Sequence, residues 1–219
     1  MITFEEAKEL SKGYKVVPIS MEIMSDIKTP MQVLRILKGV SSHCYMLESV
    51  ENQEKWGRYT FLGYDPKLEI TCTNGLMTVK NGKTEVSEVK HPGEKIKEIL
   101  KEYTSPKIKE FPTFTGGLVG YFSYDYIKYS EPKLNLDAND EEGFKDVDLM
   151  LFDKVIAFDN FSQKIIVIAN ARTENLREDY DRCVDEINKI IELIRTGEMV
   201  EVNPGKITSE FRPLFTEKE

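Results

Sequence analysis

Residues 68–86 read LEITCTNGLMTVKNGKTEV, and this stretch decides the fold class. Leu68 to Thr73 alternates apolar and polar side chains, as a half-buried strand does. Asn74-Gly75 follows directly, and Asn81-Gly82 repeats the same dipeptide seven residues later. Asn-Gly favours the tight turn of a β-hairpin because both positions tolerate positive φ. The stretch therefore predicts a meander of three short antiparallel strands.

A second hairpin is predicted further along the chain. Val147 to Phe158 and Lys164 to Ala171 are apolar runs rich in strand-forming residues, joined by a turn at Asp159-Asn160. Two shorter strands are expected at His43–Ser49 and Arg58–Gly63. Hairpins that follow one another favour antiparallel sheets over the alternating pattern of a doubly wound fold.

Capping signals place the first two helices. Thr3 and Glu6 make a capping box, in which the hydroxyl and the carboxylate each satisfy a backbone N–H at the helix start. A second helix is framed by Thr29 as N-cap, Pro30 at the first helical position and Gly39 just past the end. Both signals predict short helices in the N-terminal part of the chain.

Apolar stripes at helical spacing predict two more helices, over Pro92–Tyr103 and Glu174–Thr196. Tyr14–Ile23 is strand-like, but Pro18 lacks an N–H donor and restricts the segment to a sheet edge or to an irregular strand. We expect an α+β fold, with antiparallel sheets in a sandwich-like arrangement and peripheral helices. Residues 1–197 are expected to form the domain, and residues 198–219 a linker.

The composition is that of an acidic globular chain. Of 219 residues, 30 are Lys or Arg and 38 are Asp or Glu, which gives a formal net charge of −8. Apolar residues make up 40% of the chain, an ordinary share for a globular domain. Nucleic-acid binding needs clustered basic residues, and the sequence has no such stripe. We therefore expect no nucleic-acid partner.

Cysteine and histidine usage limits the chemistry. Cys44, Cys72 and Cys183 are odd in number and far apart, unlike a disulfide framework, so we expect free thiols. With only His43 and His91, and no metal-binding spacing, we expect no metal or cofactor site in this chain. No leader-like N-terminus or membrane-length apolar run is present, so we expect a cytoplasmic protein without a membrane partner.

Glycines interrupt the aromatic stretch Phe111–Tyr129, which is expected to be a strand leading into a helical turn. Gly116-Gly117 and Gly120 superficially resemble a phosphate-binding loop, but the Lys and Ser or Thr of a P-loop are missing. Glycines that let two backbones approach closely inside a sheet are the favoured interpretation.

Polar residues gather where two predicted strands end. Glu48 and Ser49 close one strand, and Arg58 and Thr60 open the next. An acceptor, a hydroxyl and a guanidinium could together hold an amino-acid zwitterion. The alternative from the residues alone is an ordinary cross-strand contact between Glu48 and Arg58.

At these residues the sequence resembles the family of anthranilate synthase component I, in the region before the chorismate-binding catalytic domain. The family's Leu-Leu-Glu-Ser element, followed after ten residues by Ser, stands here as Met46-Leu47-Glu48-Ser49 and Thr60. The stretches Lys55–Gly63 and Phe114–Asp125 also resemble the family's pattern. The resemblance covers the chain to about residue 172, and the long helix beyond fits the family's order of elements.

The resemblance implies a regulatory role. In this family the matched element belongs to a site for tryptophan, the feedback inhibitor, which here corresponds to Leu47, Glu48, Ser49, Arg58, Tyr59 and Thr60. The whole enzyme converts chorismate and ammonia to anthranilate and pyruvate, with magnesium in the catalytic domain and a glutaminase subunit as partner. None of the catalytic motifs can be placed in this chain, so we expect a fragment that is inactive alone.

Three alternatives remain open at this point. Component I of aminodeoxychorismate synthase, a folate-pathway relative, resembles this region in its strand and Gly-Gly patterns, although Glu48-Ser49 favours the tryptophan-pathway enzyme. A free-standing ligand-binding sensor would bind its ligand fully in isolation. A structural module would dock another subunit and show no small-molecule response.

Overall fold

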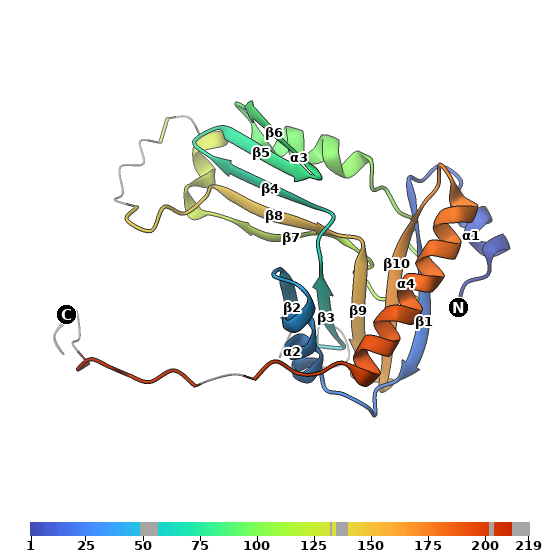
Figure 1. Ribbon diagram of the computed structural model, residues 1–219. Coiled ribbons are helices and arrows are strands. Elements are labelled where there is room, and N and C mark those ends of the chain that lie inside the picture. The colour runs from blue at the N-terminus through green and yellow to red at the C-terminus, as the bar shows by residue number, and fades with distance from the viewer. Residues whose placement is uncertain (49–56, 132, 135–139, 202–203, 212–219) are drawn as a thin grey trace.

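The computed structural model describes residues 1–48, 57–131, 133–134, 140–201 and 204–211. Within these residues the strands form two five-stranded sheets (Figure 1), in which every neighbouring pair is antiparallel. Sheet A has the order β1 (Val16–Met24), β10 (Lys164–Arg172), β9 (Lys154–Asp159), β3 (Tyr59–Tyr64) and β2 (Cys44–Glu48). Sheet B has the order β6 (Lys83–Glu88), β5 (Leu76–Asn81), β4 (Leu68–Thr73), β8 (Val147–Phe152) and β7 (Gly117–Phe122).

The predicted meander forms the outer part of sheet B. Strand β4 pairs with β5, and β5 pairs with β6, through turns at the two Asn-Gly dipeptides. Asn74 and Gly75 both have positive φ, of 50° and 81°, as the first turn requires. The hairpin at Asp159-Asn160 is confirmed by the pairing of β9 with β10. Strand β1, which contains Pro18, lies at an edge of sheet A as expected.

The prediction of one continuous strand over residues 147–158 is wrong. Strand β8 ends at Phe152 in sheet B, and β9 begins at Lys154 in sheet A, so the chain changes sheets at Asp153. The chain makes the same change between β3 and β4. These two crossings are bonded to each other, because the Lys67 amide donates to the Leu151 carbonyl at 2.7 Å.

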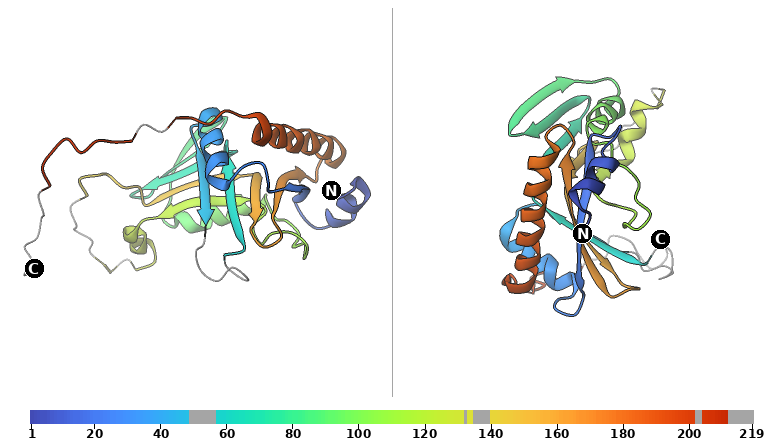
Figure 2. Two further views of the ribbon diagram at one scale, coloured as in Figure 1. Left: turned by 90° about the horizontal axis from the view of Figure 1, so that it is seen from below. Right: turned by 90° about the vertical axis from the view of Figure 1, so that its right-hand side faces the viewer.

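Helices cover one face of each sheet. Helices α1 (Phe4–Leu10), α2 (Pro30–Val40) and α4 (Leu176–Thr196) pack on sheet A around an apolar cluster that includes Ile187 and Ile190. Figure 2 shows α4 lying along this sheet, where it contacts β10 and β1. Helix α3 (Pro92–Lys101) and the 3-10 helix η1 (Tyr124–Tyr129) pack on sheet B. The α+β class with peripheral helices is confirmed.

The helix ends follow the capping signals closely. The Glu6 amide donates to the Thr3 hydroxyl oxygen, and the Thr3 amide donates to the Glu6 carboxylate, which confirms the capping box. Helix α2 continues through Gly39 to Val40, two residues beyond the expected end at Lys38. Among the described residues no helix is long and apolar enough to cross a membrane. All three cysteines lie in described segments and are free thiols.

The second face of sheet A is also buried. Val155, Ala157, Ile166 and Ile168 form a separate apolar cluster there, packed against three aromatic side chains, Tyr59, Phe61 and Phe114. Every residue of β9 is buried because the strand is covered on both faces. The continuous apolar run of its sequence follows from this position, since such runs belong to strands buried on two sides.

Glycines just before β7 and within it allow close approach of neighbouring segments. A Cβ atom at Gly120 would collide with the Asp148 carbonyl of the neighbouring strand, and Gly120 has a φ of 152°. At Gly116 a Cβ would lie 2.7 Å from the Asn170 Nδ2 atom. Both observations support close packing inside a sheet as the reason for these glycines.

Replacing Gly120 by alanine is expected to lower the free energy of unfolding by more than about 3 kcal/mol, because backbone strain and a steric clash combine. The matched control is Gly82→Ala, at a turn with positive φ but no atom within 4 Å of the new Cβ. The control should lose only about 1–2 kcal/mol. Urea denaturation of both variants measures the difference, and equal losses would contradict the packing argument.

Candidate functional site

The residues predicted to bind a ligand meet at one end of sheet A. Strands β2 and β3 pair so that Glu48 lies opposite Thr60. The Thr60 hydroxyl donates to Glu48 Oε1 at 3.4 Å and accepts a hydrogen bond from Asn160 Nδ2 at 3.3 Å. Thr60 is fully buried, whereas Glu48 is exposed. A buried hydroxyl thus positions a carboxylate that solvent, or a ligand, can reach.

The predicted residues lie on two faces of the sheet. Alternation along a strand places Glu48 and Thr60 on one face, and Leu47 and Tyr59 on the other. Tyr59 packs against the apolar cluster on that second face, and Leu47 is 48% exposed. Ser49 lies outside the described residues. The side chains therefore surround the end of the β2–β3 pair and do not line one pocket within the described residues.

Arg58 is tied to the neighbouring strand. Its Nε donates to Asp159 Oδ1 at 3.1 Å and its Nη2 donates to Asp159 Oδ2 at 2.6 Å, a bidentate pair. The amides of Phe161 and Ser162 also donate to Asp159 Oδ1. Burial opposes ionisation of Asp159, but the hydrogen bonds from Arg58 and Ser162 outweigh it and lower its pKa to about 2. The ion pair fixes the turn between β9 and β10 beside the start of β3.

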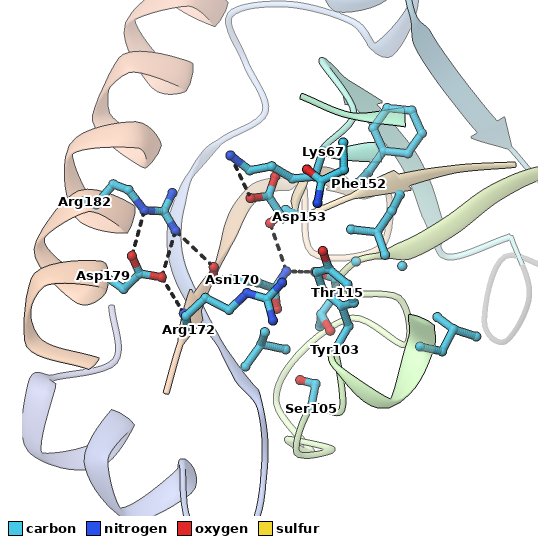
Figure 3. A pocket seen from close by; sticks show the side chains of 16 residues that line it. Lys67, Tyr103, Ser105, Thr115, Phe152, Asp153, Asn170, Arg172, Asp179 and Arg182 are labelled. Atoms are coloured by element: carbon cyan, nitrogen blue, oxygen red, sulfur yellow. Dashed lines mark hydrogen bonds and ion pairs between the residues drawn. The ribbon is translucent and has the colours of Figure 1, made fainter. Parts of the chain in front are cut away.

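A cavity that sequence reasoning missed lies at the opposite end of sheet A, where the chain crosses to sheet B. This junction cavity has a volume of about 360 Å³. Figure 3 shows side chains from several elements converging on it, among them Lys67, Tyr103, Asp153, Asn170, Arg172 and Arg182. Its size is at the lower end of the range for small-molecule sites.

Asn170 is the centre of the cavity floor. Its side-chain amide donates to the Thr115 carbonyl at 2.7 Å and to the Asp153 carbonyl at 3.0 Å. Its backbone amide donates to the same Asp153 carbonyl at 2.9 Å. These bonds join β10, the crossing at Asp153 and the segment that leads into β7. Two glycines, Gly116 and Gly117, leave the adjacent wall without side chains.

Charged side chains from α4 and from the two segments that cross between the sheets line the cavity. Arg182 and Asp179 form a bidentate pair, with Nε to Oδ1 at 3.1 Å and Nη2 to Oδ2 at 3.2 Å. Lys67 Nζ lies 3.6 Å from Asp153 Oδ2. Burial raises the pKa of Asp153, and the cations Lys67, Lys154 and Arg182 oppose this only in part.

The sequence held a weak signal for this cavity. Asp153 interrupts the apolar run of residues 147–158, and Asn170 and Arg172 end the run that follows. Isolated polar residues in buried strands need a partner, because an unpaired buried polar group destabilises the fold. The pattern identifies these positions as polar, but it does not show that their side chains come together in one cavity.

The described residues do not fit a metal site. No group of three or more His, Cys, Asp or Glu side chains among them is arranged to hold a metal ion. We therefore assign none of these residues a role in binding magnesium.

Comparison with known proteins points to one family. The family model described as chorismate binding enzyme matches residues 42–212. The chain is 34% identical to anthranilate synthase component 1 of Acetivibrio thermocellus over 86% of its length, and 31% identical to that of Aquifex aeolicus over 100%. It covers only 38% and 45% of those two relatives.

A solved structure agrees with the sequence relatives. Anthranilate synthase component I from Streptococcus pneumoniae superposes with a TM-score of 0.52 and 26% identity, over 80% of this chain and 37% of that one. The chain thus spans less than half the length of the relatives it matches.

Replacing Asp159 by asparagine is expected to lower the free energy of unfolding by about 2 kcal/mol at neutral pH. A carboxyl whose pKa is lowered on folding stabilises the fold above its unfolded pKa and loses this effect as the pH falls. The difference between wild type and variant should therefore shrink by roughly half between about pH 5 and pH 3.

Urea denaturation across this pH range checks the prediction, with Asp181→Asn as the control. Asp181 also pairs with an arginine, but its side chain is 57% exposed. The control should change stability by less than about 1 kcal/mol at every pH. A pH-independent difference for Asp159→Asn would contradict the assigned ion pair.

Proposed function

Because the chain belongs to the family of chorismate-binding enzymes, we propose that it is the N-terminal regulatory region of component I of an anthranilate synthase. The observation that carries this proposal is similarity along nearly the whole chain to relatives that bear this name, of which the chain spans less than half. The region holds part of a tryptophan site and does not catalyse the reaction by itself.

In this proposal the rest of the protein carries the chemistry. The whole enzyme converts chorismate and ammonia to anthranilate and pyruvate, and a glutaminase subunit supplies the ammonia from glutamine. Magnesium is bound by residues outside this chain. The relatives' designation as component 1 is consistent with a second component as partner.

The proposed tryptophan site is built around the end of the β2–β3 pair. The Glu48 carboxylate, held by the buried Thr60 hydroxyl, accepts hydrogen bonds from the ammonium group of tryptophan. The Ser49 hydroxyl donates to its carboxylate. Arg58 engages Asp159 through Nε and Nη2, which leaves Nη1 for the ligand. Leu47 and Tyr59 lie on the other face of the pair, where they flank the site and support the strands that carry it.

Inhibition then follows from coupling between two sites. The whole protein then has two conformations that differ in their affinity for chorismate. Tryptophan lowers the chorismate affinity if it binds more tightly to the conformation with the lower chorismate affinity. Typical coupling free energies of about 1–3 kcal/mol correspond to roughly 5- to 150-fold changes in affinity. This region alone binds the inhibitor but has no second site to influence.

Calorimetric titration of the purified chain with L-tryptophan tests the proposal. We expect saturable heat with L-tryptophan and none with L-phenylalanine, because the site selects the indole ring. The Ser49→Ala variant should bind L-tryptophan roughly tenfold more weakly, as expected for loss of a hydrogen bond to a charged group. Ser87→Ala, an exposed serine on β6, is the control and should bind as wild type does.

Equal heats for the two amino acids would contradict a tryptophan-selective site and favour the folate-pathway relative. Unchanged affinity in Ser49→Ala would contradict the role of Ser49 while leaving the family assignment intact.

A further inference from the structure

The turn between β9 and β10 is bonded to the start of β3. The Asn160 backbone amide donates to the Arg58 carbonyl at 2.8 Å, and Asn160 Nδ2 donates to the Gly57 carbonyl at 3.4 Å. Within the turn, the Gln163 side chain donates to the Asn160 carbonyl at 2.7 Å. Together with the bidentate pair of Arg58 and Asp159, these bonds hold Asn160 in one position beside the proposed ligand site.

Asn160 directs a buried hydroxyl. Its Nδ2 donates to Thr60 Oγ1 at 3.3 Å, and the Thr60 hydroxyl donates to Glu48 Oε1 at 3.4 Å. A hydroxyl has a single proton to donate, so a donor on one side of the oxygen turns that proton toward the acceptor on the other side. Thr60 is fully buried, so water does not compete for the proton. Asn160, Thr60 and Glu48 thus form a relay that orients an exposed carboxylate.

The charge at this end of sheet A is negative. Arg58 is neutralised by Asp159, and Lys164 Nζ lies 2.6 Å from Glu22 Oε2. In the part of the chain that the structure describes, Glu48 forms no ion pair, so its charge is not compensated. An uncompensated carboxylate attracts a cationic group and repels a second carboxylate.

We infer that Asn160 determines the specificity of this site: through Thr60 it orients Glu48, so that the site selects ligands that carry an ammonium group over ligands that carry only a carboxylate. Asn160 is a positioning residue and does not itself touch the ligand. The inference rests on the proposed function for the choice of an indole ring, whereas the selection of the ammonium group follows from the described residues.

Two indole compounds separate the two charged groups of tryptophan. Tryptamine carries the ring and an ammonium group, and indole-3-propionate carries the ring and a carboxylate. Calorimetric titration of the purified chain should show that tryptamine binds at least about tenfold more tightly, because only tryptamine can donate a charge-assisted hydrogen bond to Glu48. Equal affinities, tighter binding of indole-3-propionate, or no binding of tryptamine would overturn the inference.

The variant Asn160→Ala tests the positioning role. It should weaken tryptamine binding by roughly fivefold, as expected for loss of one hydrogen bond in the relay, and leave indole-3-propionate binding unchanged. A merely structural role for Asn160 predicts that both compounds lose affinity by the same factor. An unchanged ratio of the two affinities would therefore contradict the inference.

A double-mutant cycle tests whether Asn160 acts through Thr60. Thr60→Val keeps the shape of the side chain, removes the hydroxyl, and should weaken tryptamine binding at least as much as Asn160→Ala does. The double variant should bind tryptamine as Thr60→Val alone does, because Asn160 has no hydroxyl left to direct. Additive losses would contradict the relay.

Asn81→Ala is the matched control. Asn81 is an exposed asparagine on β5, in the other sheet, and the variant should bind both compounds as wild type does. If Asn160→Ala does not fold, as judged from its melting temperature, Asn160→Ser makes the same comparison, because serine is too short to reach Thr60.

The proposed function can fail separately from this inference. Selective tryptamine binding that depends on Asn160, without selectivity for L-tryptophan over L-phenylalanine, would contradict the tryptophan site and support the role of Asn160. Selective L-tryptophan binding together with an unchanged tryptamine preference in Asn160→Ala would support the tryptophan site and overturn the inference.

Discussion

The two-sheet arrangement depends on the buried side-chain amide of Asn170. One side-chain nitrogen bonds two carbonyl groups, at Thr115 and Asp153, that belong to segments far apart in the sequence. The second of these carbonyls stands where the chain leaves sheet B and enters sheet A. Buried carbonyl groups need donors, and a strand that changes sheets loses its ladder partners at the bend. The Asn170 backbone amide supplies one donor to the Asp153 carbonyl, and the Asn170 side chain supplies a second and joins this bend to the Thr115 carbonyl.

The two ends of sheet A differ in character. One end of sheet A has an exposed carboxylate, Glu48, positioned by a buried hydroxyl and flanked by the Arg58–Asp159 pair. The other end has a partly open cavity lined by Arg172, which stacks on Tyr103, and by the buried carboxylate of Asp153. Strands β3, β9 and β10 run from one end to the other.

Local signals in the sequence predicted elements well and their assembly less well. Asn74-Gly75 determines its turn by backbone preference alone, so the meander was predictable. The change of sheets at Asp153 was not, because a bend stabilised by Asn170 from another strand leaves no turn residues in the sequence. The pairing of Glu48 with Thr60 followed from two adjacent strands. The junction cavity was missed because its residues come from segments that only the tertiary fold brings together.

The most direct test of this account is hydrogen–deuterium exchange on the Asn170→Ala variant. If the amide fixes the crossing, backbone amides over residues 115–119 and 151–155 should exchange faster than in wild type. Those in the middle of α4, which packs on the far side of sheet A from this bond, should keep their protection. Unchanged exchange at both segments would contradict the claim that Asn170 holds the two sheets in place.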